Sequence, residues 1–127
     1  MNDEQYLHHC TLLLREFSND LLKRTESLDE EDSLRELAVA FGNLNSGSAD
    51  IYADGQTLVS RLFTTYPDFG PTFPRELLWF LGGDCLHFMP DEEIKLHQQL
   101  EDQRHALAVK GEVIDFAEAR AKLLKLQ

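Results

Sequence analysis

The sequence lacks the features that define several large protein classes. Its longest uninterrupted apolar run is five residues, whereas a membrane-spanning helix needs about 20. The first ten residues, MNDEQYLHHC, contain no basic segment followed by an apolar one, so we expect no signal peptide and a cytoplasmic location. The only cysteines are Cys10 and Cys85, and without an export signal we expect both to be reduced thiols.

Motifs of common active sites and nucleic-acid-binding domains are also missing. There is no Gly-rich phosphate loop, no serine-nucleophile motif, no Cys-x-x-Cys pair and no stretch of mixed basic and aromatic residues. Basic residues are few, 12 against 23 acidic ones, which gives a formal net charge of −11. Such a surface repels nucleic acid and anionic membranes. We therefore expect no direct contact with nucleic acid, no membrane association and no cofactor.

The residues that are present indicate a globular helical protein. The chain has 127 residues, 43% of them hydrophobic and 28% charged, which suits one domain over residues 1–127. Apolar residues recur at helical spacing in several segments, and no segment alternates with a period of two for long enough to form a sheet. The prediction is an all-α, single-domain bundle of five or six helices.

The central part of the bundle is expected within residues 71–93, which hold the only Trp and the only Gly-Gly pair. Residues 77–81 are all apolar, and a helix that is apolar on every side must be buried on every side. We predict a short, fully buried central helix at residues 74–81, with Trp79 in the core and the other helices packed around it.

Capping residues and helix breakers set the expected helix ends. Asn2 with Gln5 and Ser27 with Glu30 match the capping-box pattern. The sequence PDFGP at residues 67–71 is typical of a rigid turn, and Thr72 is expected to cap the central helix. The expected helices span about residues 2–25, 27–44, 50–66, 74–81, 90–109 and 115–127, and residues 43–48 are expected to form a loop.

One glycine within an expected helix predicts a packing contact. Gly55 lies on the apolar side of the helix at residues 50–66, although glycine costs about 1 kcal/mol relative to alanine there. We therefore expect a second helix to approach so closely that a Cβ atom would obstruct it.

The most suggestive chemical cluster is Asp84-Cys85-Leu86-His87, directly after Gly82-Gly83. Cys85 and His87 with a neighbouring carboxylate are candidates for a thiolate–imidazole pair, and the glycines would admit a substrate. The alternative is a helix C-cap followed by a small core cysteine, since buried free cysteines are commonly inert. We expect the second arrangement, in which Cys85 is not a nucleophile.

A second pattern places Glu93, His97, Glu101 and His105 four residues apart on one expected helix. Residues at i and i+4 can share a metal ion, which makes His97, Glu101 and His105 candidate ligands. Each step of four residues advances about 40° around the helix, so the four side chains cannot all face one ion. We interpret them as a solvated polar face.

Four apolar residues flank the central helix in sequence and are candidates for partner binding: Phe69, Phe73, Phe88 and Met89. Aromatic residues and methionine are common at protein interfaces. The acidic residues around them would favour a partner with a basic surface. The alternative is that all four close the core. Because twofold dimers are the commonest soluble assembly, we also expect a homodimer.

Three functions are compatible with these patterns. The first is an adaptor or regulator that acts by protein–protein interaction without catalysis. The second is a thiol- or metal-dependent enzyme or sensor that uses Cys85 and His87. The third is an acidic mimic of nucleic acid that occupies a basic surface of its partner. The missing catalytic constellation favours the first, and thiol reactivity or competition with DNA would distinguish the others.

Overall fold

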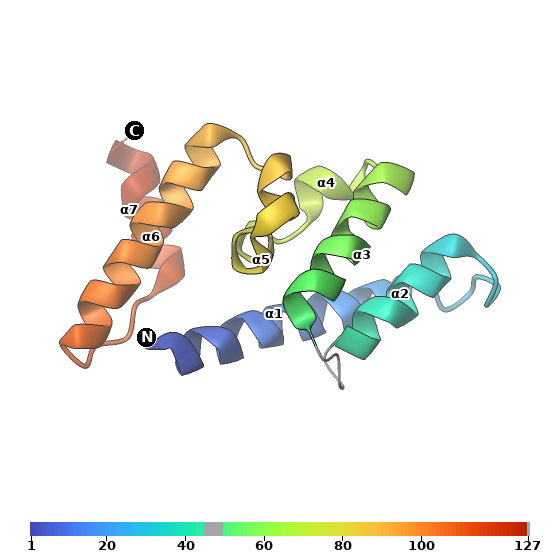
Figure 1. Ribbon diagram of the computed structural model, residues 1–127, viewed down its shortest axis with the longest axis horizontal. Coiled ribbons are helices and arrows are strands. Elements are labelled where there is room, and N and C mark those ends of the chain that lie inside the picture. The colour runs from blue at the N-terminus through green and yellow to red at the C-terminus, as the bar shows by residue number, and fades with distance from the viewer. Residues whose placement is uncertain (45–49, 127) are drawn as a thin grey trace. The chain divides into compact units, whose positions relative to one another are not determined.

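The computed structural model describes residues 1–44 and 50–126 (Figure 1). These residues form seven α-helices and one 3₁₀ helix without any strand, which confirms the all-α prediction. The helices are α1 (Asp3–Arg24), α2 (Ser33–Leu44), α3 (Ile51–Thr65), α4 (Phe69–Thr72), α5 (Arg75–Leu81), η1 (Gly83–Phe88), α6 (Asp91–Val109) and α7 (Phe116–Leu126). Of the expected loop at residues 43–48, Asn43 and Leu44 end α2, and the rest lies outside the described residues.

Two short helices account for the difference from the expected five or six. The predicted rigid turn at residues 67–71 contains the start of α4, in which Pro71 is tolerated because the first turn of a helix leaves its backbone N–H groups unpaired. Thr72 was expected to cap α5 but instead ends α4, where its hydroxyl donates to the Phe69 carbonyl at 3.3 Å. The link between α5 and α6 is the 3₁₀ helix η1.

The capping patterns locate some helix starts correctly and one incorrectly. The Asn2–Gln5 capping box is confirmed, since each backbone N–H donates to the other side chain at 2.8 Å. Helix α2 begins at Ser33 and not near residue 27. The carboxylate of Asp32 accepts from the Leu34 N–H at 2.9 Å, so the acid closest to the apolar stripe caps the helix.

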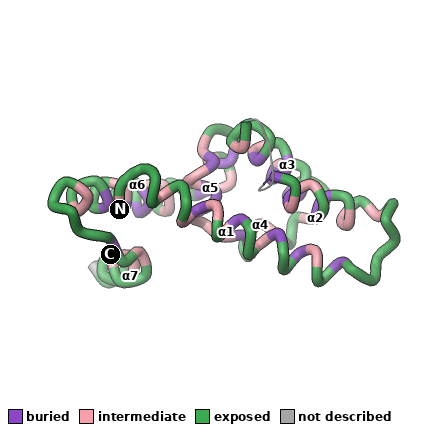
Figure 2. The backbone as a smooth tube through the Cα atoms, turned by 90° about the horizontal axis from the view of Figure 1, so that it is seen from below, coloured by how far each residue is buried: buried purple, intermediate pink, exposed green. Residues whose placement is uncertain are grey.

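The chain divides into two compact units, and the expectation of one domain over the whole chain stays a prediction. The larger unit is Cys10–Phe88. Buried positions recur every three to four residues along α1 (Figure 2), at Cys10, Leu14, Ser18 and Leu21. In this unit α3 packs against α2, α4, α5 and η1.

The core of the larger unit is built around Phe73. Its ring is 1% exposed and lies edge-on to Phe17 and Phe63, at centroid distances of 4.7 and 5.4 Å. Phe41 is 6.5 Å from it, and Phe63 continues the series to Phe88 at 4.8 Å. Edge-to-face pairs of this kind are favourable beyond the apolar area that they bury. Phe73 therefore occupies the central position that the sequence suggested for Trp79.

Helix α5 is buried on one side only, which corrects the expectation of a fully buried central helix. Leu77, Leu78 and Leu81 are buried, whereas Trp79 and Phe80 are partly exposed. Phe80 lies against Tyr52 at a centroid distance of 5.2 Å, and Tyr52 is 45% exposed. A helix of seven residues at the edge of the core can thus carry large apolar side chains on a partly solvated side.

The predicted close approach at Gly55 is confirmed. A Cβ atom at this position would lie 2.7 Å from Cδ2 and 3.2 Å from Cδ1 of Leu81. Gly55 thus lets α5 pack directly against the backbone of α3.

The smaller unit comprises Met1–His9 and Met89–Gln127. Leu96 and Leu100 of α6 are buried, as is Ile114 before α7. Phe116 stacks on His9 at a centroid distance of 5.1 Å. Helix α6 buries only a narrow stripe, which also includes His97 and Arg104. No helix within the described residues is both long enough and apolar enough to cross a bilayer.

Candidate functional site

The Asp84-Cys85-Leu86-His87 cluster lies on η1 and has one buried and two exposed polar members. Cys85 is fully buried and free, while Asp84 and His87 are exposed. Burial, and secondarily the negative charge of Asp84, raises the pKa of the Cys85 thiol from 9.0 to about 11. A nucleophilic cysteine requires a lowered pKa and access to substrate. This environment therefore disfavours thiolate chemistry.

The neighbouring Gly82 and Gly83 form a tight turn that is filled by Gln56. Both glycines have positive φ, 64° and 51°, which suits residues without a Cβ atom. The Gln56 amide donates to the Leu81 carbonyl at 3.0 Å, and its oxygen accepts from the Asp84 N–H at 3.4 Å. A Cβ on Gly83 would lie 2.6 Å from the Gln56 oxygen. The space that a substrate would need beside the glycines is thus occupied by a side chain of α3.

The candidate metal ligands on α6 face different surroundings. His97 is buried, Glu101 is half-buried and His105 is exposed. Glu101 and His105 both approach Arg104, at 3.7 and 3.2 Å from its Nη2. Among residues 1–44 and 50–126, no three His, Cys, Asp or Glu side chains are grouped so that they could hold a metal ion. Burial of His97 shows that this side of α6 is not uniformly solvated.

Arg104 was not singled out by the sequence, although it organises the smaller unit. Its side chain is 3% exposed, and its Nη1 donates to the Met1 carbonyl at 3.1 Å and to the Asp3 carboxylate at 3.2 Å. Its guanidinium also lies 4.4 Å from the centre of the Tyr6 ring, a favourable cation–π distance. These contacts join α6 to the first turn of α1 and give the buried guanidinium of Arg104 a structural role.

The four predicted partner-binding residues are not all on the surface. Phe73 and Met89 are 1% and 5% exposed, and this burial is what the alternative of core closure expects for them. Phe73 is buried because the rings of Phe17, Phe41 and Phe63 converge on its position. Phe69 and Phe88 are partly exposed, and Phe69 lines a pocket.

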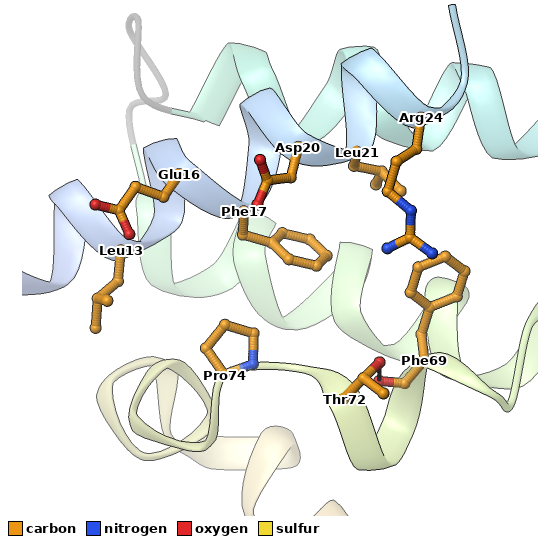
Figure 3. A pocket seen from close by; sticks show the side chains of 9 residues that line it. All are labelled: Leu13, Glu16, Phe17, Asp20, Leu21, Arg24, Phe69, Thr72 and Pro74. Atoms are coloured by element: carbon orange, nitrogen blue, oxygen red, sulfur yellow. Dashed lines mark hydrogen bonds between the residues drawn. The ribbon is translucent and has the colours of Figure 1, made fainter.

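That pocket lies between α1 and the segment from α4 to the start of α5, and has a volume of about 230 Å³ (Figure 3). We call it the α1–α4 pocket. The sticks in Figure 3 show Phe17 and Phe69 pointing into the space between these segments, with Pro74 facing Phe17. Its lining residues are Leu13, Glu16, Phe17, Asp20, Leu21, Arg24, Phe69, Thr72 and Pro74.

The floor of the α1–α4 pocket is continuous with the core. Phe17 lines the pocket. Its ring also packs edge-on against those of Phe41 and Phe73, at centroid distances of 5.3 and 4.7 Å. Two hydrogen bonds from Arg75 fix the opposite wall. Arg75 donates to the Gly70 carbonyl at 2.7 Å and to the Phe88 carbonyl at 3.1 Å. The apolar surface of the pocket is therefore held in place by contacts with buried side chains and by hydrogen bonds from Arg75 to backbone carbonyls.

Charged groups follow one edge of the pocket along α1. Glu16, Asp20 and Arg24 are spaced by four residues, and all three are exposed. Within the described part of the chain, neither the Glu16 nor the Asp20 carboxylate takes part in an ion pair or a side-chain hydrogen bond. The Arg24 guanidinium instead lies over the Phe69 ring, 5.8 Å from its centre. The pocket thus combines an apolar floor with two unpaired carboxylates and one cation.

Sequence reasoning identified one pocket residue, Phe69, and missed the wall supplied by α1. A signal was present in α1 itself. Leu13 and Phe17 are four residues apart and lie beside the Leu14–Leu21 stripe. Glu16 and Asp20 are also four residues apart, and each lies three residues after a member of that apolar pair. A helix with a second apolar pair next to its main stripe has a wider apolar face than one buried contact requires.

Comparison with known proteins gives one positive result. A family model described as PA2817-like matches residues 1–127, the full length of the chain. No curated protein and no solved structure matches the chain.

Proposed function

The chain belongs to the PA2817-like family, and we propose that it acts in the cytoplasm as an adaptor or regulator, by binding another protein. The α1–α4 pocket is the proposed docking site for a segment of that partner. The observation that carries the proposal is the combination of a preformed apolar floor, a volume of about 230 Å³ and exposed charged residues at the edge. Protein interfaces have this arrangement, an apolar centre within a polar rim.

The rigidity of the pocket supports docking. A binding surface that is already ordered loses little conformational entropy when the partner arrives. Phe17 is fixed by its contacts with Phe41 and Phe73. Phe69 is fixed by the α4 backbone, where the Phe73 N–H donates to its carbonyl at 2.9 Å.

The charge of the chain supports a basic partner. The net charge of −11 would accelerate encounter with a positively charged protein surface and disfavour nucleic acid or other acidic proteins. The high pKa of Cys85 weighs against the alternative of a thiol-dependent enzyme, since only the thiolate is reactive.

A site-specific crosslinking experiment tests the proposal. A photoreactive phenylalanine analogue replaces Thr72, which lines the pocket, and the variant is irradiated in its native cell. Thr57 on α3 is the matched control. It is also an exposed threonine whose hydroxyl donates to a backbone carbonyl, and it does not line the pocket.

The expected result is a covalent protein adduct at position 72 that is absent at position 57 and is lost when Phe69→Ala is added. The substitution removes pocket surface without removing a backbone hydrogen bond of α4. No adduct at position 72, or an adduct that persists in Phe69→Ala, would count against the proposal.

Self-association is a separate proposal, in which two copies form a homodimer. Val109 and Val113 are 90% and 63% exposed and lie close together in sequence, and Leu124 is 53% exposed. Exposed apolar residues of this size favour burial against a second copy. Light scattering at increasing concentration is expected to give twice the 14.6 kDa chain mass. Val113→Ser should shift the protein towards monomer, and a monomer at every concentration would refute the proposal.

A further inference from the structure

We infer that the α1–α4 pocket recognises a lysine or arginine side chain that stands next to a bulky apolar residue in the partner. This inference rests on the proposed function and adds to it the chemistry of the segment that binds. The argument uses the size of the pocket, the two carboxylates at its edge and the cation that already lies on Phe69.

The size of the pocket favours a few side chains over a complete small molecule. Sites for cofactors and drug-sized ligands commonly measure about 300–1,000 Å³, whereas this pocket measures about 230 Å³. Phe17 and Pro74 face each other across it (Figure 3), which gives a flat apolar side chain two surfaces to contact. A protein segment would place one bulky residue between them and continue past the open edge.

The carboxylates specify the charge of the neighbouring residue. Glu16 and Asp20 are four residues apart on α1, so their side chains lie on the same side of the helix, about 5–6 Å apart at Cβ. Neither is neutralised by another described residue of the chain. One cationic side chain can approach both carboxylates at once, and charge-assisted hydrogen bonds are stronger than neutral ones.

Arg24 gives the site a direction. It follows Glu16 by eight residues, which corresponds to about 12 Å along the helix axis, and its guanidinium lies over Phe69. The edge is therefore negative at the Glu16 end and positive at the Arg24 end. A segment that binds in one orientation places its basic residue beside Glu16 and Asp20 and keeps it away from Arg24, so the reverse orientation is disfavoured.

The test selects ligands without assuming their sequence. A phage-displayed library of random linear peptides is selected on the full chain, and the enriched peptides are synthesised with a fluorophore. Their affinities are measured by fluorescence anisotropy for the parent chain, for Glu16→Gln/Asp20→Asn and for Phe69→Ala. The matched control is Glu26→Gln/Asp29→Asn, which removes the same two charges from exposed positions outside the pocket.

We expect the enriched peptides to carry lysine or arginine beside a bulky apolar residue. Their affinity should fall about tenfold or more in Glu16→Gln/Asp20→Asn and change less than about twofold in the control, since opposite charges act strongly only at close range. Equal weakening by both double variants would overturn the inference, because it would assign the effect to net charge.

Two further outcomes separate this inference from the proposed function. Peptides that depend on Phe69 but contain no basic residue would overturn the inference and leave the docking site in place. If no enriched peptide depends on Phe69, both the docking site and the inference are wrong.

Discussion

Phe73→Ala is expected to be among the most destabilising single substitutions in the larger unit. The side chain is 1% exposed and contacts Phe17, Phe41 and Phe63. Truncation of a buried phenylalanine to alanine costs about 3–5 kcal/mol, and three lost ring pairs at about 0.5–1.5 kcal/mol each place this site near the upper end. Phe73→Leu keeps most of the volume and should cost about 1–2 kcal/mol.

Urea unfolding followed by far-UV circular dichroism measures these losses. With an m-value of about 2 kcal/mol per molar urea, a loss of about 4 kcal/mol lowers the midpoint by about 2 M. The control is Tyr52→Ala, a 45% exposed aromatic with one ring neighbour, for which we expect about 1 kcal/mol. The central role of Phe73 is refuted if its alanine variant loses less than about 1 kcal/mol, or no more than the Tyr52 control does.

Three further predictions concern the thiol, the close helix contact and the buried arginine. Because the pKa of Cys85 is about 11 instead of 9.0, iodoacetamide at about pH 8 should alkylate it about 100-fold more slowly in the folded chain than in urea, as measured by peptide mass spectrometry. Similar labelling rates in the folded chain and in urea would contradict this assignment of the pKa. The folded chain should also lose stability as the pH rises from 9.0 towards 11, because in this range the thiol ionises in the unfolded chain and not in the folded one. Gly55→Ala should destabilise the chain by about 1–2 kcal/mol, since its Cβ would lie 2.7 Å from a methyl group of Leu81, the leucine that ends α5. The control Gly70→Ala has no neighbour within 4 Å and should stay within about 0.5 kcal/mol of the parent. The reverse order of stability would show that α5 shifts freely. Arg104→Met should reduce the hydrogen-exchange protection of α6 by about 1–3 kcal/mol, because it removes the contacts with Met1 and Asp3. The control Lys122→Ala, which breaks an exposed ion pair, should reduce it by about 0.5 kcal/mol. Equal protection in both variants would show that Arg104 does not anchor α6 to α1.

Local signals were sufficient to predict most helices. The reciprocal bonds of Asn2 and Gln5, and the cap of Asp50 on the Ala53 N–H at 3.1 Å, depend on residues close in sequence. Gly111, with φ of 74°, follows the end of α6, a position at which glycine is common. The start of α2 was predicted incorrectly because several acids in a row offer alternative caps, and only Asp32 is adjacent to the packed part of the helix.

The central residue of the core could not be identified from local signals. Trp79 is the largest side chain in an all-apolar run, yet it is partly exposed, while Phe73 between two prolines is buried. Which of them is enclosed depends on where Phe17, Phe41 and Phe63 converge, and these residues come from three separate helices. Burial of this kind is decided by tertiary contacts and not by the composition of one segment.

The candidate site was predicted only in part for the same reason. Phe69 was identified because it is an aromatic residue between two prolines. The other wall, with Glu16, Phe17 and Asp20, belongs to a helix about 50 residues away in sequence. A pocket formed by segments so far apart has no local motif that would identify it.

The composition of the smaller unit has a consequence for the order of folding during synthesis. It combines Met1–His9, made before the larger unit, with Met89–Gln127, made after it. The beginning of α1 therefore cannot obtain its Arg104 contacts until Arg104 has left the ribosome. Residues Cys10–Phe88 are contiguous and can fold while later residues are still being added. Nascent chains arrested after residue 88 should accordingly protect α3 from proteolysis while residues 1–9 remain cleavable.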